Sequence, residues 1–346
     1  MGIRRYDSIR DIVTDFRSRG EATALKYLQD GELCTISYGD LADRVFQEAE
    51  TLPDYADAVI CDHRPKTVIR ILADAVADRD TLMADERITP MSVDGATRML
   101  EYRQIGYYSG QGAFCFFTSG SSGVPRVVIL PQRTLTCNAW SGQMMLPFRP
   151  EDTVYMILPL SHVYGFVNGL LWGLAYGATV ALGTDRTRIA EDLKVFRPTI
   201  FPAVPLYMEQ LTAPEAINPE LEKVIVGGAR LSEVTLKTLR EAGLTVYLGY
   251  GLTETASGIA ITQDPEEPQA LSPCPGADIR IEPDGEISVE TPCLMEGYLG
   301  EPVLEEPRWY TGDLGRIDER GRLFVLGRKD GVDDRVIRQS WKTKEI

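Results

Sequence analysis

A glycine-rich loop joins two apolar runs in the stretch Ala113-Phe-Cys-Phe-Phe-Thr-Ser-Gly-Ser-Ser-Gly-Val-Pro-Arg-Val-Val-Ile-Leu130. The runs 113–117 and 127–130 have the length and the aromatic or β-branched content of buried strands. Glycines let backbone N–H groups approach an anion, hydroxyl groups donate further hydrogen bonds, and Arg126 adds a positive charge. The stretch therefore predicts a phosphate-binding loop between two strands. Taken alone, it fits a ligand-free hairpin loop of small polar residues equally well.

Strands and helices alternate on both sides of this loop, which favours an α/β fold with a parallel sheet. Upstream, apolar periodicity predicts helices over 8–28, 41–50 and 66–77, strands over 35–40 and 57–61, and a surface stretch of weak periodicity over 84–111. Downstream, short apolar runs predict strands over 154–158, 179–182, 199–201, 223–226 and 245–248. Ser232 as N-cap and Gly243 as terminator predict a helix over 232–242.

The pattern changes after Ala256. Two alternating segments turn at Asp284-Gly285 and near Arg320-Gly321, and each predicts a β-hairpin. We therefore expect layered sheets with flanking helices plus a small antiparallel β subdomain. The expected division is an N-terminal α/β subdomain over 1–112, a central α/β subdomain over 113–261, the β subdomain over 262–326 and a stub over 327–346.

Composition excludes several classes of protein. With 36 basic and 51 acidic residues among 346, the net charge of −15 opposes binding to nucleic acid. No apolar run is long enough to span a membrane, and the N-terminus lacks the apolar core of a signal peptide. The six cysteines form no CxxC pair and only two histidines occur, so a zinc site is not expected. We expect a cytoplasmic protein with reduced thiols.

The loop 118–126 resembles the TSGSTGxPK phosphate loop of the adenylate-forming superfamily, which includes acyl-CoA and aryl-CoA synthetases, adenylation domains of peptide synthetases, and luciferases. Arg126 stands where the family has Lys, and it keeps the charge that grips phosphate oxygens. The resemblance implies that the loop holds the β- and γ-phosphates of ATP. The implied contacts are Thr118, Ser119, Gly120, Ser121, Ser122, Gly123 and Arg126.

Leu248-Gly-Tyr-Gly-Leu-Thr-Glu254 matches the family's YGxTE motif. The resemblance implies that Tyr250 stacks on adenine beside Gly251, that Thr253 contacts the α-phosphate, and that Glu254 binds Mg²⁺. A hard carboxylate suits Mg²⁺, which neutralises phosphate charge. Thr253, Glu254 and Arg126 are the expected catalytic residues, with helix capping as the alternative role of Thr253 and Glu254.

Two other segments resemble parts of the family's substrate pocket. Leu158-Pro-Leu-Ser-His-Val-Tyr-Gly165 is similar to the LPxxH segment, and Val226-Gly-Gly-Ala-Arg230 is similar to the loop against adenine. The acid-binding residues implied are His162, Val163, Tyr164, Gly227, Gly228 and Gly251. The nucleotide-binding residues implied are Gly228, Ala229 and Arg230. A core histidine held by hydrogen bonds is the alternative for His162.

Trp309-Tyr-Thr-Gly-Asp-Leu314 and Leu326-Gly-Arg-Lys-Asp330 resemble the family's Y(R)TGDL and GRxD segments. They imply that Asp313 accepts the ribose hydroxyls, that Arg328 helps to bind ribose or phosphate, and that Asp330 is the hinge of a C-terminal lid. The lid's continuation does not follow Asp330. Three explanations stay open: a chain cut at the hinge, a lid supplied by a separate chain, or a protein without a lid.

The resemblance implies ATP-dependent activation of a carboxylic acid to an acyl-adenylate, with pyrophosphate released and CoA or an acyl carrier protein as the possible acceptor. Amino-acid-activating members place an Asp in the pocket segment to pair the substrate ammonium. None occurs between Leu158 and Gly169, so an aryl or acyl acid without an α-amino group is favoured. The rival hypothesis is a non-catalytic module that binds nucleotide or acyl-adenylate and acts with a partner chain.

Overall fold

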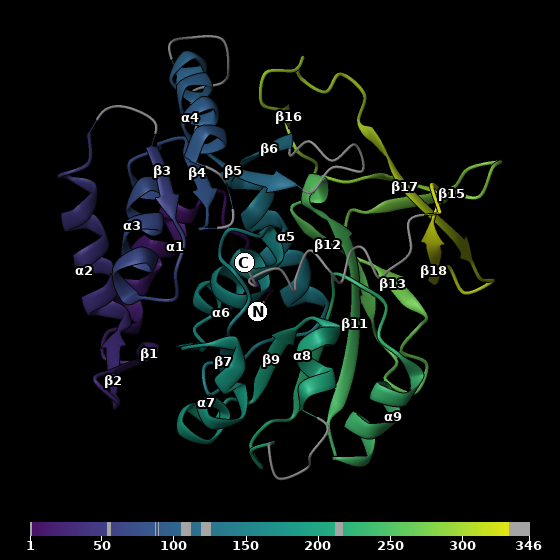
Figure 1. The fold of residues 1–346 in the computed structure, drawn as a ribbon, viewed down its shortest axis with the longest axis horizontal. Helices are drawn as coiled ribbons and strands as arrows, with labels where there is room; N and C mark the ends of the chain where they lie inside the picture. Colours follow the sequence, from purple (N-terminus) through teal and green to yellow (C-terminus); the bar gives the residue numbers. More distant parts are fainter. Residues whose placement is uncertain are drawn as a thin grey trace.

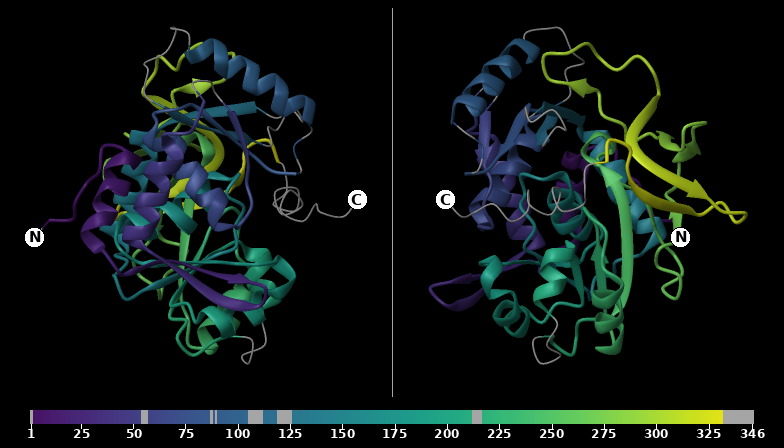
Figure 2. Two further views of the ribbon diagram at one scale, coloured as in Figure 1. Left: turned by 90° about the vertical axis from the view of Figure 1, so that its left-hand side faces the viewer. Right: turned by 45° about the vertical axis from the view of Figure 1, so that its right-hand side comes forward.

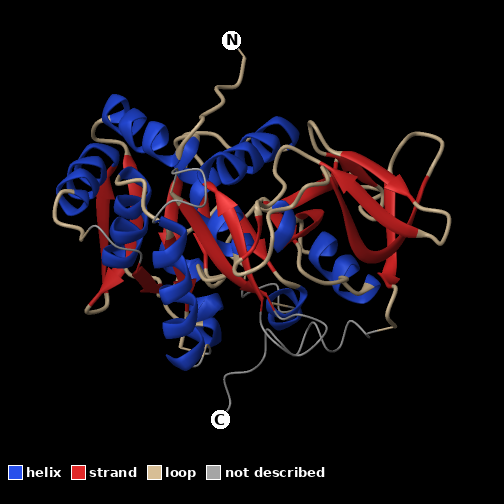
Figure 3. Ribbon diagram, turned by 90° about the horizontal axis from the view of Figure 1, so that it is seen from above, coloured by secondary structure: helices blue, strands red, loops and turns tan. Residues whose placement is uncertain are grey.

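The computed structural model describes residues 2–53, 57–86, 88, 90–104, 112–118, 126–211 and 217–331, which form a mixed α/β fold (Figure 1). Within these ranges the strands lie in two sheets, one of five strands and one of thirteen. Figure 3 shows helices along the strands over most of the molecule, whereas one end is built from strands. No described helix is long and apolar enough to cross a bilayer.

The smaller sheet carries the two strands that flank the glycine-rich loop. Its order is β16-β6-β5-β4-β3. The bounds are β3 Asp57–Ile60, β4 Thr81–Ala84, β5 Ala113–Thr118, β6 Arg126–Pro131 and β16 Gly297–Tyr298. β5 and β6 are antiparallel, and Thr118 at the end of β5 lies opposite Arg126 at the start of β6. The two strands predicted around the loop are confirmed, and β16 brings a distant segment beside them.

The larger sheet has the order β14-β15-β17-β18-β13-β12-β11-β10-β9-β7-β8-β1-β2. The bounds of its first part are β1 Thr23–Gln29, β2 Glu32–Ser37, β7 Thr153–Met156, β8 Thr179–Leu182, β9 Ile200–Ala203, β10 Lys223–Val226 and β11 Thr245–Leu252. Those of its second part are β12 Ser257–Thr262, β13 Leu271–Pro273, β14 Asp278–Ile281, β15 Glu286–Glu290, β17 Arg308–Ile317 and β18 Leu323–Arg328.

Strand β11 joins a parallel half of this sheet to an antiparallel half. Its first four residues pair with the parallel strand β10, and its last four pair with the antiparallel strand β12. Both predicted hairpins are confirmed, and Gly285 and Gly321 adopt positive φ at their turns. Figure 2 shows the antiparallel strands extending away from the helical part of the molecule. The subdomain limits at 112, 261 and 326 stay a prediction.

The helices cover the parallel strands. Their bounds are α1 Ile9–Phe16, α2 Tyr38–Ala49, α3 Pro65–Val76, α4 Pro90–Gln104, α5 Gln132–Met145, α6 Trp172–Ala175, α7 Ile189–Phe196, α8 Pro205–Gln210 and α9 Glu233–Glu241. A π-helix, Gly165–Leu171, leads into α6, and a 3-10 turn, Thr253–Thr255, follows β11. The predicted cap of α9 is confirmed, since Ser232 accepts a hydrogen bond from the backbone of Thr235 at 3.0 Å. One buried core joins α1, α2 and α3 to α5 and the π-helix.

The helix predicted over 8–28 is wrong in its second half. The chain there forms α1, a short 3-10 turn and then strand β1, because Gly20 takes φ +50° and the chain beyond it pairs with β2 and β8. Tertiary pairing overrides local periodicity in this segment. The strand predicted over 35–40 is also partly wrong, since β2 ends at Ser37 and residues 38–40 begin α2.

The stretch 84–111, expected to run over the surface, contains α4. The described side chains of α4 are mostly exposed or half-buried, and Leu100 packs into a buried cluster with residues of the smaller sheet. The predicted helices over 41–50 and 66–77 and the strand over 57–61 lie close to α2, α3 and β3.

Candidate active site

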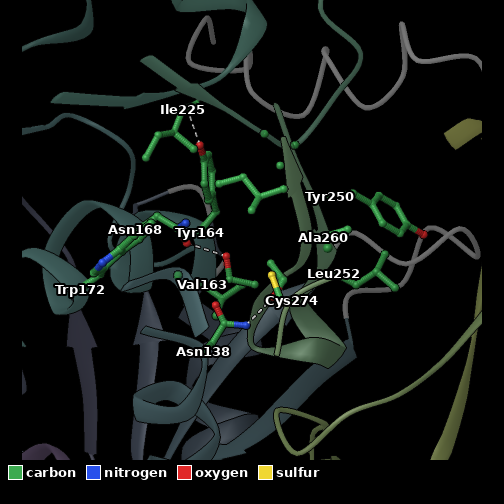
Figure 4. Close-up of a pocket in the computed structure, with 18 of the residues that line it drawn as sticks. Asn138, Val163, Tyr164, Asn168, Trp172, Ile225, Tyr250, Leu252, Ala260 and Cys274 are labelled. Carbon is green, nitrogen blue, oxygen red and sulfur yellow. Dashed lines mark hydrogen bonds between the residues drawn. The ribbon is translucent and has the colours of Figure 1, made fainter. Parts of the chain in front are cut away.

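A cavity lies where β11 passes from its parallel to its antiparallel partner, beside α5 and the π-helix (Figure 4). The ends of parallel strands are the usual ligand position in open α/β sheets. The described residues that line the cavity are Asn138, Gly142, His162, Val163, Tyr164, Asn168, Trp172, Ile225, Gly227, Gly228, Gly249, Tyr250, Gly251, Leu252, Thr253, Ser257, Gly258, Ala260, Ile261 and Cys274. They include all six residues expected to bind the acid.

Tyr164 fixes one wall of this cavity. Its hydroxyl donates to the carbonyl oxygens of Ile225 at 2.7 Å and Ala203 at 3.3 Å, at the ends of β10 and β9. Burial raises the pKa of Tyr164, so the phenol stays a donor. Gly227 packs on its ring, since a Cβ at Gly227 would lie 3.1 Å from Tyr164 Cζ. The segment around His162 is therefore anchored to the central sheet.

The turn after the Thr253–Glu254 pair is tightly folded. A Cβ at Gly251 would lie 1.7 Å from the carbonyl oxygen of Ser257, so only glycine fits there. Ser257 itself has φ +107°, a conformation that costs a non-glycine residue free energy. Two asparagines hold the turn: Asn138 Nδ2 donates to the carbonyl oxygen of Gly258 at 2.8 Å, and Asn168 Oδ1 accepts from Ser257 Oγ at 2.7 Å. The strained turn thus fixes the position of Thr253.

Tyr250, Asp313 and Arg328 form a second cluster at the start of the antiparallel half. Tyr250 donates its hydroxyl hydrogen to Asp313 Oδ2 at 2.7 Å, and Arg328 Nη1 donates to Asp313 Oδ1 at 3.2 Å. Burial raises the pKa of Asp313, while the hydrogen bond from Tyr250 and the charge of Arg328 oppose that rise. Asp313 and Arg328 lie opposite each other on β17 and β18. The carboxylate keeps lone pairs for further donors such as hydroxyl groups.

Glu254 and Arg126 meet at a third cluster through Tyr298. The Tyr298 hydroxyl donates to Glu254 Oε1 at 2.7 Å, and the Arg126 guanidinium lies 3.2 Å from the centre of the Tyr298 ring. Arg126 also donates to both carboxylate oxygens of Glu301, at 3.1 and 2.7 Å. β16, which carries Tyr298, pairs with β6, which begins at Arg126.

Glu254 fits a magnesium ion. It is a partly buried carboxylate oriented by a neutral hydroxyl, and oxygen donors are what Mg²⁺ prefers. Among the residues that the structure describes, no group of three or more His, Cys, Asp or Glu could hold a metal. A cation at Glu254 would therefore take its other ligands from phosphate and water, as Mg²⁺ commonly does at nucleotide sites.

The structure brings most of the predicted site residues together. Thr118 and Arg126 lie at the paired ends of β5 and β6, whereas Ser119, Gly120, Ser121, Ser122 and Gly123 lie outside the described residues. Gly228 reaches the cavity, but Ala229 and Arg230, which follow it, do not line it. Asp330 lies just after β18, with Oδ2 3.7 Å from Arg328 Nη2. Binding roles for all of these residues stay predictions.

Sequence reasoning missed Asn138, Asn168, Trp172, Tyr298 and Glu301. One signal was available for Asn168, because it is a polar residue inside the apolar run 166–172, where a buried amide needs partners. Tyr298 and Glu301 carried no such signal. Their contacts with Glu254 and Arg126 depend on strand pairing between distant parts of the chain.

Comparison with known proteins shows which family the chain resembles. A model of the AMP-binding enzyme family matches residues 54–299. An oxalate–CoA ligase of Arabidopsis thaliana is 29% identical over 290 residues, covering 75% of this chain and 55% of that protein. A 2-succinylbenzoate–CoA ligase of Salmonella typhimurium is 29% identical over 220 residues, and the match covers 62% of this chain and 47% of that protein. The chain thus spans about half the length of these curated relatives.

Among solved structures, the o-succinylbenzoate coenzyme A synthetase of Bacillus subtilis in complex with ATP and magnesium ion superposes with a TM-score of 0.76. Its sequence is 20% identical, and the match covers 92% of this chain and 80% of that one. At this identity the superposition shows a shared fold. The family match covers well over half of the sequence and includes Arg126, Tyr250 and Glu254. The chain belongs to the AMP-binding enzyme family.

Proposed function

We propose that this chain activates a carboxylic acid. The carboxylate oxygen attacks the α-phosphorus of Mg·ATP, the bond to the β-phosphate oxygen breaks, and acyl-adenylate and pyrophosphate form. The observation that carries the proposal is one cavity whose lining includes both the motif residues Tyr250 and Thr253 and the pocket-segment residues His162 and Tyr164. Nucleotide and acid would meet there with their reacting groups adjacent, which is the main requirement for this reaction.

The nucleotide would be held by three parts of the site. Asp313, oriented by Tyr250 and Arg328, would accept hydrogen bonds from the ribose hydroxyls. Thr253 would donate to the α-phosphate, and Arg126 with the loop 118–126 would grip the β- and γ-phosphates. These contacts place positive charge and donors where negative charge grows during the displacement. Glu254 would hold Mg²⁺, which would neutralise part of the phosphate charge.

The acid would occupy the apolar side of the cavity, near His162, Val163 and Gly227. Oxalate and 2-succinylbenzoate are the acids in the names of two curated relatives, and CoA is their acceptor. We propose CoA or a carrier protein as the acceptor here. Because the chain spans about half of those relatives, transfer to a thiol would need a lid domain, supplied by a separate chain or by further sequence.

Acid-dependent formation of acyl-AMP tests this proposal. The chain is incubated with Mg·ATP and a panel of aryl and aliphatic acids, and the products are identified by mass spectrometry. An acyl-AMP that disappears in Glu254→Gln supports the proposal. Tight binding of ATP without acyl-AMP from any acid, even after a lid domain from a related ligase is added, would support a nucleotide-binding module instead.

A further inference from the structure

The acid side of the cavity contains two buried amides that are only partly satisfied. Asn168 is 8% exposed and Asn138 is 5% exposed. Asn168 Oδ1 accepts from Ser257, but no described residue accepts a hydrogen bond from its Nδ2 group. Asn138 Nδ2 donates to the carbonyl oxygens of Thr255 and Gly258, but no described residue donates to its Oδ1. Both residues line the cavity (Figure 4). Neither atom is among the fully enclosed side-chain atoms that lack a partner, so both can reach a ligand or solvent in the cavity.

These unpaired atoms matter energetically. A buried amide group that loses water and gains no partner costs free energy, so a ligand that fills this cavity is favoured when it supplies one. Asn168 Nδ2 offers hydrogen-bond donors, and Asn138 Oδ1 offers an acceptor. A hydroxyl group can satisfy either, whereas a methyl group of similar size satisfies neither.

The wall of the cavity contains few ionisable groups. Its described lining has no Asp, Glu, Lys or Arg side chain, and His162 is its one histidine. An ammonium group on the substrate, or a second carboxylate beyond the reach of His162, would therefore be buried without a counter-charge, at a large cost in desolvation. The far end of the acid should be neutral.

Trp172 limits the length of the acid. Its side chain is 1% exposed and lies stacked on Phe148, with ring centres 4.0 Å apart and planes at 3°. Its Nε1 donates to Gln143 Oε1 at 2.8 Å. On the cavity side α5 approaches through Gly142, where a Cβ would lie only 2.9 Å from the indole. An indole fixed in this way does not move aside for a long chain.

We propose that the acid pocket selects a short or single-ring monocarboxylic acid whose far end carries a neutral oxygen, bound by the Asn168 amide in a pocket closed by Trp172. This inference rests on the proposed function and adds a substrate class to it. Asn168 and Trp172 are the specificity-determining residues, one by hydrogen bonding and the other by closing the pocket.

Binding of non-hydrolysable acyl-adenylate analogues tests this proposal without requiring turnover. We would measure the Kd of acyl-sulfamoyl-adenosines that differ only in the acyl group, by calorimetry. The groups compared are meta- and para-hydroxybenzoyl, the methylbenzoyl isosteres, the carboxybenzoyl and aminomethylbenzoyl forms, and decanoyl. One hydroxybenzoyl analogue should bind about tenfold more tightly than its methyl isostere. The charged analogues should bind about a hundredfold more weakly. Decanoyl should also bind more weakly, because the fixed indole of Trp172 leaves no room for a long chain.

Asn168→Asp gives a sharper readout, because Asp keeps the acceptor for Ser257 and replaces the donor group by a negative oxygen. In this variant the preference should change from the hydroxyl to the aminomethyl analogue. Gln263→Glu, the same amide-to-carboxylate change at an exposed residue outside the cavity, should leave the preference unchanged. If Asn168 only holds the turn at Ser257 and does not select the acid, Asn168→Asp would weaken the binding of all analogues equally. That result would overturn the assignment.

The outcomes separate this inference from the proposed function. If the analogues bind but hydroxyl and methyl forms bind equally, or decanoyl binds as well as either, the inference is wrong and acid activation stands. If ATP and every analogue fail to bind, the proposed function is wrong, and the inference fails with it.

Discussion

Tyr298 donates its hydroxyl hydrogen to Glu254 Oε1 across 2.7 Å. The guanidinium of Arg126 lies over the face of the same ring, 3.2 Å from its centre. One side chain thus connects the carboxylate expected to hold the metal to the cation expected to hold the terminal phosphates. Burial, followed by the charge of Glu254, raises the pKa of Tyr298, so the hydroxyl remains a donor throughout the neutral range.

Tyr298→Phe should slow acyl-AMP formation because it removes this hydrogen bond and leaves the ring in place. We expect kcat to fall about tenfold and the Mg²⁺ concentration for half-maximal rate to rise. Pyrophosphate release measured across a magnesium titration gives both numbers. Tyr310→Phe, at a phenol that is 51% exposed, is the matched control. Equal rates for wild type and Tyr298→Phe would show that the Tyr298 hydroxyl has no role in the reaction.

Glu301 competes with phosphate for Arg126. Both guanidinium hydrogen bonds to Glu301 occupy donors that a phosphate would need. Glu301→Gln should therefore tighten ATP binding about threefold, since a neutral amide holds the guanidinium less strongly. Calorimetric Kd values for the two proteins test this, and Glu305→Gln serves as the surface control. Weaker ATP binding in Glu301→Gln would mean that Glu301 positions Arg126 instead of competing for it.

The raised pKa of Asp313 leads us to expect that nucleotide binding depends on pH. Because burial raises its pKa, protonation begins at a higher pH than for an ordinary carboxyl group, and the protonated form accepts hydrogen bonds poorly. As the pH decreases, ATP affinity should therefore begin to fall at a higher pH than an ordinary carboxyl group would cause. ATP itself also takes up protons as the pH decreases, so the ratio of wild-type to Asp313→Asn affinity is the quantity to follow. A ratio that stays constant with pH would contradict the assignment of Asp313.

Gly251 and Gly249 form a matched pair for stability. A Cβ at Gly251 would collide with the backbone of Ser257 and Gly258, whereas a Cβ at Gly249 meets nothing within 4 Å. Gly251→Ala should lower the free energy of unfolding by about 3 kcal/mol or more, and Gly249→Ala by less than about 1 kcal/mol. Urea unfolding followed by circular dichroism compares them. Similar midpoints for the two variants would mean that the turn relaxes freely.

The sequence predicts the fold class well where apolar runs are short and bounded by glycine or proline. β5, β6, β10 and both hairpins were expected close to their observed positions. Failure occurred at 8–28, where the helical spacing of Leu25 and Leu28 continues into a strand. Pairing of β1 with β8 outweighs the local helical pattern there, and the residues of β8 lie far along the chain. A pattern of neighbouring residues contains no information about such distant pairing.

The site divides in the same way. Motif residues such as Tyr250, Glu254 and Asp313 can be recognised because each belongs to a short motif of consecutive residues. Tyr298 reaches Glu254 only because β16 pairs with β6, and Asn168 reaches Ser257 only through packing of the π-helix against a strained turn. The structure is therefore needed to find the residues proposed to position or select, whereas the residues proposed to bind nucleotide and metal can be found in the sequence.

The cavity is proposed to join a carboxylic acid to the AMP part of ATP. Exchange of labelled pyrophosphate into ATP, with and without acid, in wild type and in Glu254→Gln, measures this reaction and its reversal. Exchange that requires an acid and falls at least about a hundredfold in the variant is the predicted result. Exchange that is absent with every acid, although ATP binds and the protein is folded, would contradict the proposed activation.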